Sequence, residues 1–337
     1  MSVYQTALFT DIDFARDGKQ VGRVSLPNSV TRSAYGVIPI PIAVIRNGEG
    51  PTLVLMAGNH GDEYEGQIVL GRLIRDLEAD QVRGRVIILP SANLPAARAG
   101  LRVSPLDGGN LNRVFPGDPL GGPTRQIAHF IATVLMPMAD CFVDIHSGGA
   151  SLDYIPYVAA TVTGEPEFDR RAMAALKAFG GPYGQIWGPS ERGVAESAAP
   201  RPQCISLGGE FGGRGVVNPG HVAYVDRGVK NLMSHLGILP SETVQPQGAM
   251  KLMTSEPDDL YTFSPDYGVF VPACTLGDTV AKGQLAGEVH AIEHPERPPQ
   301  PVYFRAPGLL ICLRAIGRVE PGDCLAHLAT DIEEPVE

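Results

Sequence analysis

The stretch Thr52-Leu53-Val54-Leu55-Met56-Ala57-Gly58-Asn59-His60-Gly61-Asp62-Glu63 joins an apolar run to a polar turn. A short, continuous apolar run that ends at a glycine predicts a buried β-strand. A second run of this kind, Cys141-Phe142-Val143-Asp144-Ile145, ends at His146. Ligands collect at the carboxyl ends of strands in open α/β sheets, so we expect the polar residues after the two runs to converge there.

Three of these polar residues have the side chains of a zinc site. His60 and Glu63 place an imidazole and a carboxylate three residues apart, and His146 adds a second imidazole. Two nitrogens and one carboxylate oxygen leave one of the four zinc positions open, which distinguishes a catalytic site from a structural one. A lone histidine at a strand end is more often structural, so the prediction depends on both strand ends together. The pattern predicts a zinc hydrolase.

Further polar residues suit the chemistry of such a site. Asp144 lies two residues before His146 and on the same strand face, so it can orient a zinc-bound imidazole, and we expect that of His60. Asn112 and Arg113, in a glycine-containing loop, offer an amide and a planar guanidinium for a substrate carboxylate. Glu210, between glycines, can move a proton from water to a leaving amine. Ordinary surface and turn roles are the alternatives.

The chain up to residue 240 alternates short apolar runs with helical periodicity, which is typical of a largely parallel sheet covered on both faces. Helix 219–236 is the clearest, with Asn218 as its cap and Gly237 as its stop. Strand 37–45 contains two prolines that cannot donate to a ladder, so we place it at a sheet edge. We expect the other strands at 52–57, 85–89 and 141–145, and the other helices at 65–77 and 124–138.

The C-terminal part has a different texture. After a linker over 240–248, short apolar runs alternate with turn dipeptides such as Gly277-Asp278 and Pro307-Gly308, and helical periodicity disappears. This pattern is similar to a biotinyl/lipoyl-like barrel, without a match for the lysine that would carry the cofactor. We therefore predict a catalytic α/β domain over 1–245 and a smaller all-β, barrel-like domain over 246–337 that shapes the mouth of the active site.

Composition restricts the partners. The 337 residues carry a formal net charge of −10 and no basic run, which argues against nucleic acid and favours a small-molecule substrate. The five cysteines are scattered, without a CxxC pair, so we expect neither a disulfide framework nor a thiolate zinc site. No secretory signal and no membrane-spanning run is visible, which predicts a cytoplasmic protein without a membrane partner. Serine-nucleophile, phosphate-loop and dinucleotide motifs are absent from the sequence.

Four motifs together resemble the succinylglutamate desuccinylase/aspartoacylase family, relatives of the zinc carboxypeptidases. They are His60-Gly61-Asp62-Glu63, Asn110-Leu111-Asn112-Arg113-Val114-Phe115-Pro116-Gly117, Asp144-Ile145-His146-Ser147-Gly148, and Glu210. Within the family, the chain is most similar to the N-acetyl-diaminobutyrate deacetylases of ectoine breakdown, from about Phe14 through the β tail. The usual aspartate of the Asp-Leu-Asn-Arg motif is Asn110 here.

The resemblance implies a zinc carboxypeptidase-like fold and a role for each site residue. It implies Zn²⁺ on His60, Glu63 and His146, Glu210 as general base and acid, Asn112 with Arg113 as the carboxylate clamp, and Arg102 as the group that polarises the scissile carbonyl. The implied reaction is hydrolysis of the amide bond of a small N-acyl amino acid, first of all N-acetyl-L-2,4-diaminobutyrate. Desuccinylase, aspartoacylase or carboxypeptidase activity, or a catalytically silent metal- or metabolite-binding module, are the alternatives. The side-chain pocket, for which Asp153 is one candidate, and assembly into a homo-oligomer stay open.

Overall fold

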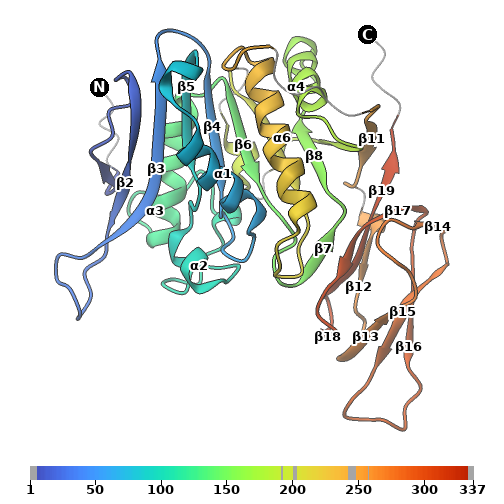
Figure 1. Cartoon of the computed structure of the whole chain (residues 1–337). Helices are drawn as coiled ribbons and strands as arrows, with labels where there is room; N and C mark the ends of the chain where they lie inside the picture. Colours follow the sequence, from blue (N-terminus) through green and yellow to red (C-terminus); the bar gives the residue numbers. More distant parts are fainter. Residues whose placement is uncertain (1–5, 191–192, 200–202, 242–247, 257, 333–337) are drawn as a thin grey trace.

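The computed structural model describes residues 6–190, 193–199, 203–241, 248–256 and 258–332. Helices lie on both faces of a large sheet in the first two thirds of the chain, and the last third is built of strands (Figure 1). The helices are α1 (Glu65–Asp76), α2 (Leu94–Ala99), α3 (Pro123–Phe130), α4 (Pro166–Phe179), α5 (Ala195–Ala198) and α6 (Pro219–His235).

One mixed sheet runs through most of the molecule. Its strand order is β1-β2-β3-β5-β4-β6-β10-β8-β9-β11-β19-β17-β14, and β12 and β7 pair with β19 and β17 off this path. The strands up to β10 are β1 (Phe9–Thr10), β2 (Gly18–Pro27), β3 (Val37–Asn47), β4 (Thr52–Ala57), β5 (Gly84–Leu89), β6 (Cys141–Ile145), β7 (Leu152–Tyr154), β8 (Tyr157–Thr161), β9 (Tyr183–Trp187) and β10 (Ile205–Glu210). Strands β5, β4, β6 and β10 are parallel neighbours, whereas β8 runs against β10.

The central strands are buried on both faces, which explains their unbroken apolar sequences. In β4, Leu53 and Leu55 pack in a core with residues of α1, α4 and α6. Val54 and Met56 point to the opposite face, where residues of α3 cover the sheet. Strand alternation therefore gives both layers of helices an apolar partner.

The helices begin and end close to where the sequence places them. Asn218 Oδ1 accepts a hydrogen bond from the backbone N–H of Gly220 at 2.8 Å, and Gly237 has a φ of +74° just after α6. The expected helix 124–138 is present as α3 followed by a π-helical turn, η3 (Ile131–Leu135), and a 3₁₀ turn, η4 (Met136–Met138). Among the described residues, no helix is long and apolar enough to span a membrane.

The edge position expected for strand 37–45 is wrong. Strand β3 lies inside the sheet, between β2 and β5. However, β5 pairs with Ala43 to Asn47, so the half that contains Pro39 and Pro41 has β2 as its one neighbouring strand in the described part of the chain. The prolines are tolerated because the missing N–H groups do not interrupt pairing with a second strand.

The C-terminal part continues the large sheet and adds a small one. Its strands are β11 (Lys251–Thr254), β12 (Tyr261–Phe263), β13 (Gly268–Pro272), β14 (Thr279–Val280), β15 (Leu285–His290), β16 (Gln300–Tyr303), β17 (Gly308–Arg314), β18 (Arg318–Val319) and β19 (Cys324–Asp331). Strand β11 pairs parallel with β9, and a separate antiparallel sheet has the order β16-β15-β13-β18. The predicted fold class, a mixed sheet flanked by helices with a smaller C-terminal β part, is confirmed. The predicted boundary between residues 245 and 246 lies outside the described residues.

Candidate metal and catalytic site

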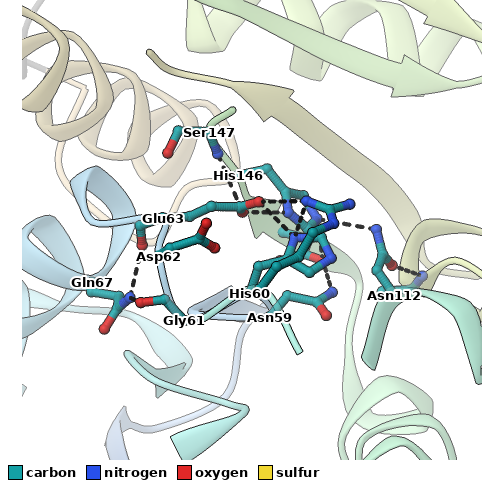
Figure 2. Close-up of polar contacts among 12 residues, drawn as sticks. Asn59, His60, Gly61, Asp62, Glu63, Gln67, Asn112, His146 and Ser147 are labelled. Carbon is teal, nitrogen blue, oxygen red and sulfur yellow. Dashed lines mark hydrogen bonds and ion pairs between the residues drawn. The ribbon is translucent and has the colours of Figure 1, made fainter. Parts of the chain in front are cut away.

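The candidate site lies where β4 and β6 end. The two strands are parallel and in register, with Ala57 opposite Ile145, so the residues after them emerge side by side. His60 and Glu63 follow β4, and His146 follows β6 directly. Glu63 Oε1 lies 2.6 Å from His60 Nδ1, and Glu63 Oε2 lies 2.8 Å from His146 Nδ1 (Figure 2). All three side chains are buried.

The other nitrogen of each imidazole contacts an oxygen. His60 Nε2 lies 3.1 Å from Asn110 Oδ1, which is fixed as the amide oxygen because it also accepts the backbone N–H of Asn112. His146 Nε2 lies 2.8 Å from Asp144 Oδ2. When both Nε2 atoms donate, both Nδ1 atoms present lone pairs to the carboxylate of Glu63.

Lone pairs that face a carboxylate at these distances require a cation or protons between them. One ligand atom from each of His60, Glu63 and His146 lies within 4.8 Å of the others. Two neutral imidazoles and a carboxylate are a donor set that suits zinc, so the residues present fit a metal ion.

Charges at the site shift the proton affinities of its members. Burial opposes the ionised form of Glu63, but the neighbouring His60 and His146 outweigh it and lower the pKa of this carboxyl. Burial likewise opposes protonation of His146, whereas Asp144 and Glu63 raise its pKa well above the usual value. A proton on the ring and a divalent cation are alternatives at the same position.

The turn that carries His60 and Glu63 is held by close backbone contact. A Cβ on Gly61 would lie 2.0 Å from the backbone carbonyl carbon of Ala96, so only glycine fits between this turn and α2. The Gln67 side chain of α1 donates to the backbone oxygens of Gly61 and Glu63 (Figure 2). Ser147 N donates to Glu63 Oε2 at 3.3 Å, which ties the two strand ends together.

Asp144 does not contact the imidazole expected for it. Its Oδ2 lies beside His146 Nε2 and accepts a hydrogen bond from Asn59 Nδ2 at 2.7 Å. His146 continues the pairing of β6 as a parallel bridge to Glu210, so Asp144 and His146, two residues apart, share one face and the aspartate lies beside this imidazole. The imidazole of His60 has Asn110 as its partner instead, a role that its place in the motif signals but that our sequence reasoning missed.

Arg102 reaches the site. Its guanidinium lies 3.4 Å from Glu63 Oε1 and 3.4 Å from His60 Nδ1, and its side chain remains partly exposed. A cation at the open side of the buried ligand cluster is in a position to face a substrate that enters from solvent.

Asn112 and Arg113 lie beside His146. Asn112 Nδ2 is 3.3 Å from His146 Nε2, and Asn112 Oδ1 accepts the backbone N–H of Ala195 at 2.8 Å. The Arg113 guanidinium donates to the backbone oxygen of Asn112 at 2.6 Å. The two residues therefore occupy one corner of the site, next to α5.

Glu210 ends the neighbouring strand β10. His146 N donates to Gly209 O and Phe211 N donates to His146 O, both at 3.0 Å, so the backbone fixes Glu210 beside His146. Among the described residues, its buried Oε2 has no hydrogen-bond partner. Burial, and then the charge of Glu63, raise the pKa of Glu210 to about 8. A cation at the site would oppose this shift and favour the carboxylate.

One further carboxyl at the site has no motif in the sequence. Glu196 of α5 is buried, and its Oε1 lies 3.8 Å from His146 Nε2. Burial, and then the charge of Asp144, raise the pKa of Glu196 to about 7.

Asp153, the candidate for the side-chain pocket, lies on β7, where it pairs with Leu313 of β17 and is in electrostatic reach of Arg214.

Comparison with known proteins gives consistent relatives. The N-alpha-acetyl-L-2,4-diaminobutyric acid deacetylase of Halomonas elongata is 39% identical over 96% of this chain and 94% of its own length. A succinylglutamate desuccinylase/aspartoacylase from Rhodobacter sphaeroides superposes with a TM-score of 0.92 at 39% identity, covering 98% of this chain and 100% of that one. The product-bound ectoine utilisation protein EutE (DoeB) of Ruegeria pomeroyi gives a TM-score of 0.92 at 38% identity, covering 96% and 99%.

The family profile agrees with these relatives. The succinylglutamate desuccinylase/aspartoacylase catalytic domain matches residues 49–236, a range that contains each of the candidate site residues described above. Both the predicted resemblance and its extent along the chain are confirmed. The chain belongs to the succinylglutamate desuccinylase/aspartoacylase family.

Proposed function

We propose that the protein is a zinc-dependent amidohydrolase that removes the acetyl group of N-acetyl-L-2,4-diaminobutyrate. The observation that carries the chemistry is the lone-pair arrangement of His60, Glu63 and His146 next to the buried, unpartnered oxygen of Glu210. The substrate is supported by the relative of that name, which shares 39% identity over 96% of the chain.

His60, Glu63 and His146 would hold the metal ion. A zinc ion held there would polarise the scissile carbonyl and acidify a water molecule. Asp144 and Asn110 orient the two imidazoles through their Nε2 atoms, which leaves both Nδ1 atoms as ligands.

Glu210 moves the proton. Its carboxylate takes a proton from the attacking water, and the carboxylic acid then returns that proton to the departing amine nitrogen. The bond between the carbonyl carbon and nitrogen breaks, and acetate and the free amino acid are the products. Burial raises the pKa of Glu210 and a metal ion beside it would lower that pKa, so the two influences on this proton act in opposite directions.

The substrate is held by two cationic groups. Arg102 faces the cluster from its open side, where it binds the carbonyl oxygen as negative charge develops. Asn112 and Arg113 bind the α-carboxylate, since a guanidinium and an amide together offer several donors to its oxygens. These contacts would serve the α-carboxylate of any N-acyl amino acid.

A substrate panel tests the proposal. The zinc-loaded protein is assayed with N-acetyl-L-2,4-diaminobutyrate, N-acetyl-L-aspartate and N-succinyl-L-glutamate, and kcat/KM is compared, since specificity is a ratio of these constants. We expect the diaminobutyrate derivative to be cleaved fastest. Preference for either of the other two substrates would assign the chain to aspartoacylase or desuccinylase activity with the same zinc chemistry. Turnover of none would indicate a silent binding module.

A further inference from the structure

Four carboxyl groups surround His146, and the proposed reaction uses three of them. Glu63 faces the metal position, Asp144 orients the imidazole, and Glu210 moves the proton. The proposed reaction assigns no role to Glu196, although only 4% of its surface is exposed. A buried carboxyl is costly unless a partner offsets the loss of hydration, so a group in this position requires an explanation.

The charged groups around Glu196 are Asp144, His146 and Arg113. Among the described residues, its carboxyl has a hydrogen bond from its own backbone N–H and the contact of 3.8 Å with His146 Nε2. The imidazole nitrogen is already engaged by Asp144 at 2.8 Å. A carboxylate has about four acceptor positions on its two oxygens, so that of Glu196 can accept a further donor.

The position of Glu196 relative to the carboxylate clamp is fixed by the backbone. Ala195 N donates to Asn112 Oδ1, so the residue before Glu196 is tied to one member of the clamp. Glu196 is also in electrostatic reach of Arg113, the other member, and of Glu210. A molecule whose α-carboxylate binds at Asn112 and Arg113 would bring its side chain close to Glu196.

A glycine of β10 lies against the carboxyl group of Glu196. A Cβ on Gly208 would lie 2.8 Å from Glu196 Oε1 and 2.9 Å from the six-membered ring of Trp187. Gly208 shares its face of the sheet with Glu210, two residues further along β10. The carboxyl and the aromatic ring thus flank one small residue, and both kinds of group attract an ammonium ion.

We propose that Glu196 binds the side-chain ammonium of the substrate and selects a cationic amino acid. This inference rests on the proposed deacetylase function and adds the residue that determines its specificity. In 2,4-diaminobutyrate three carbon atoms separate the ammonium from the carboxylate carbon, so one molecule can reach both the clamp and Glu196. An aspartate or glutamate side chain at the same place would bring a second carboxylate to Glu196 and be repelled.

The test compares a cationic side chain with a neutral one of equal size. Wild type, Glu196→Gln and Glu196→Asp are assayed on N-acetyl-L-2,4-diaminobutyrate and N-acetyl-L-norvaline, with zinc content measured in each protein. We expect Glu196→Gln to lower the ratio of the two kcat/KM values by about 10- to 100-fold, the effect of one charge-assisted hydrogen bond. Glu196→Asp retains the charge and most of the preference. Asp153→Asn, the same chemical change at the other candidate acid, should leave the ratio unaltered.

Two outcomes would overturn the role of Glu196. One is an unchanged ratio in a zinc-loaded Glu196→Gln protein, and the other is an equal loss on both substrates together with a loss of zinc, which would make Glu196 a support for His146. Calorimetry with 2,4-diaminobutyrate and norvaline on the zinc-loaded wild type adds a measurement that needs neither turnover nor a folded variant. Equal affinities would refute the inference, whereas failure of the deacetylase proposal would appear as absent turnover of the acetylated substrate despite selective binding.

Discussion

The amide oxygen of Asn110 lies 3.1 Å from Nε2 of His60, and the same oxygen accepts the backbone N–H of Asn112. One side chain thus fixes the tautomer of a candidate metal ligand and the start of the loop that carries the proposed carboxylate clamp. We predict that Asn110→Asp tightens zinc binding by about tenfold, because a carboxylate makes the ring more basic, and that Asn110→Ala weakens it by about 10- to 100-fold. Competition with a chromogenic chelator measures both changes, and equal affinity of all three proteins would contradict the assigned contact.

The ligand set predicts the metal content of variants. The purified protein should bind about one zinc ion per chain, and His146→Ala should lose most of it, since one imidazole and one carboxylate do not retain zinc against dialysis. Elemental analysis after dialysis gives the answer. His221 of α6 lies outside the proposed ligand set, so His221→Ala is a matched control. Full occupancy in His146→Ala would place the metal elsewhere.

Glu210→Gln separates proton transfer from metal binding. The amide preserves the shape of the side chain but cannot move a proton, so kcat should fall by about 10²- to 10⁴-fold while zinc content and thermal stability are retained. Steady-state kinetics on the zinc-loaded variant provides the measurement. Turnover within threefold of wild type would assign the base to another residue.

Gly61→Ala should disturb the turn after β4 that carries the two proposed ligands His60 and Glu63. The added methyl group meets the backbone of Ala96, and overpacking of this kind costs about 1 to 3 kcal/mol. We expect a lower free energy of unfolding in urea together with weaker zinc binding. Gly71→Ala is the control, because an added Cβ on Gly71 of α1 would make one ordinary contact, 3.8 Å to Arg75 Nη1, and alanine there should be neutral or stabilising by up to about 1 kcal/mol.

His327 should make stability depend on pH. It is buried in β19, stacks on Tyr261 at 3.7 Å between ring centroids and donates through Nε2 to Ser255 O, and burial lowers its pKa to about 4. Below its unfolded pKa of about 6.5 the unfolded chain binds a proton that the folded protein excludes, so stability falls as pH decreases toward 4. The loss amounts to about 3 kcal/mol at most. In His327→Gln the free energy of unfolding at pH 5 should approach that at pH 7. Urea titrations at several pH values measure it, and a pH dependence equal to that of wild type would show that this histidine is not the cause.

The sequence predicted what local patterns determine. Strand 52–57 was identifiable because every residue of β4 is buried, which requires an unbroken apolar sequence. Helix 219–236 was identifiable because both its ends carry capping signals. The interior position of β3 depends on which distant strand pairs with it, and no local pattern encodes this. The pairing of β6 continues through His146, so strand alternation places this ring beside Asp144. The position of His60 depends instead on the turn after β4, which strand alternation does not determine.

Glu196 shows a different limit. It occupies a segment without periodicity or motif, and it becomes a candidate for function only when α5 is folded against Asn112 and β10. Sequence patterns reveal residues whose neighbours in the chain share their task. They do not reveal a residue whose partners are all remote in sequence.

The pairing of β7 with β17 gives synthesis of the chain a fixed order of events. Strand β7 follows the His146 loop almost directly, yet its ladder partner is made only when the ribosome reaches residues 308–314. Strand β11 pairs with β9 on one side, and its partner on the other side, β19, is synthesised only at residues 324–331. A nascent chain that has completed every candidate catalytic residue therefore still has open edges at β7 and β9, and such edges attract other chains until the last strands close the sheet.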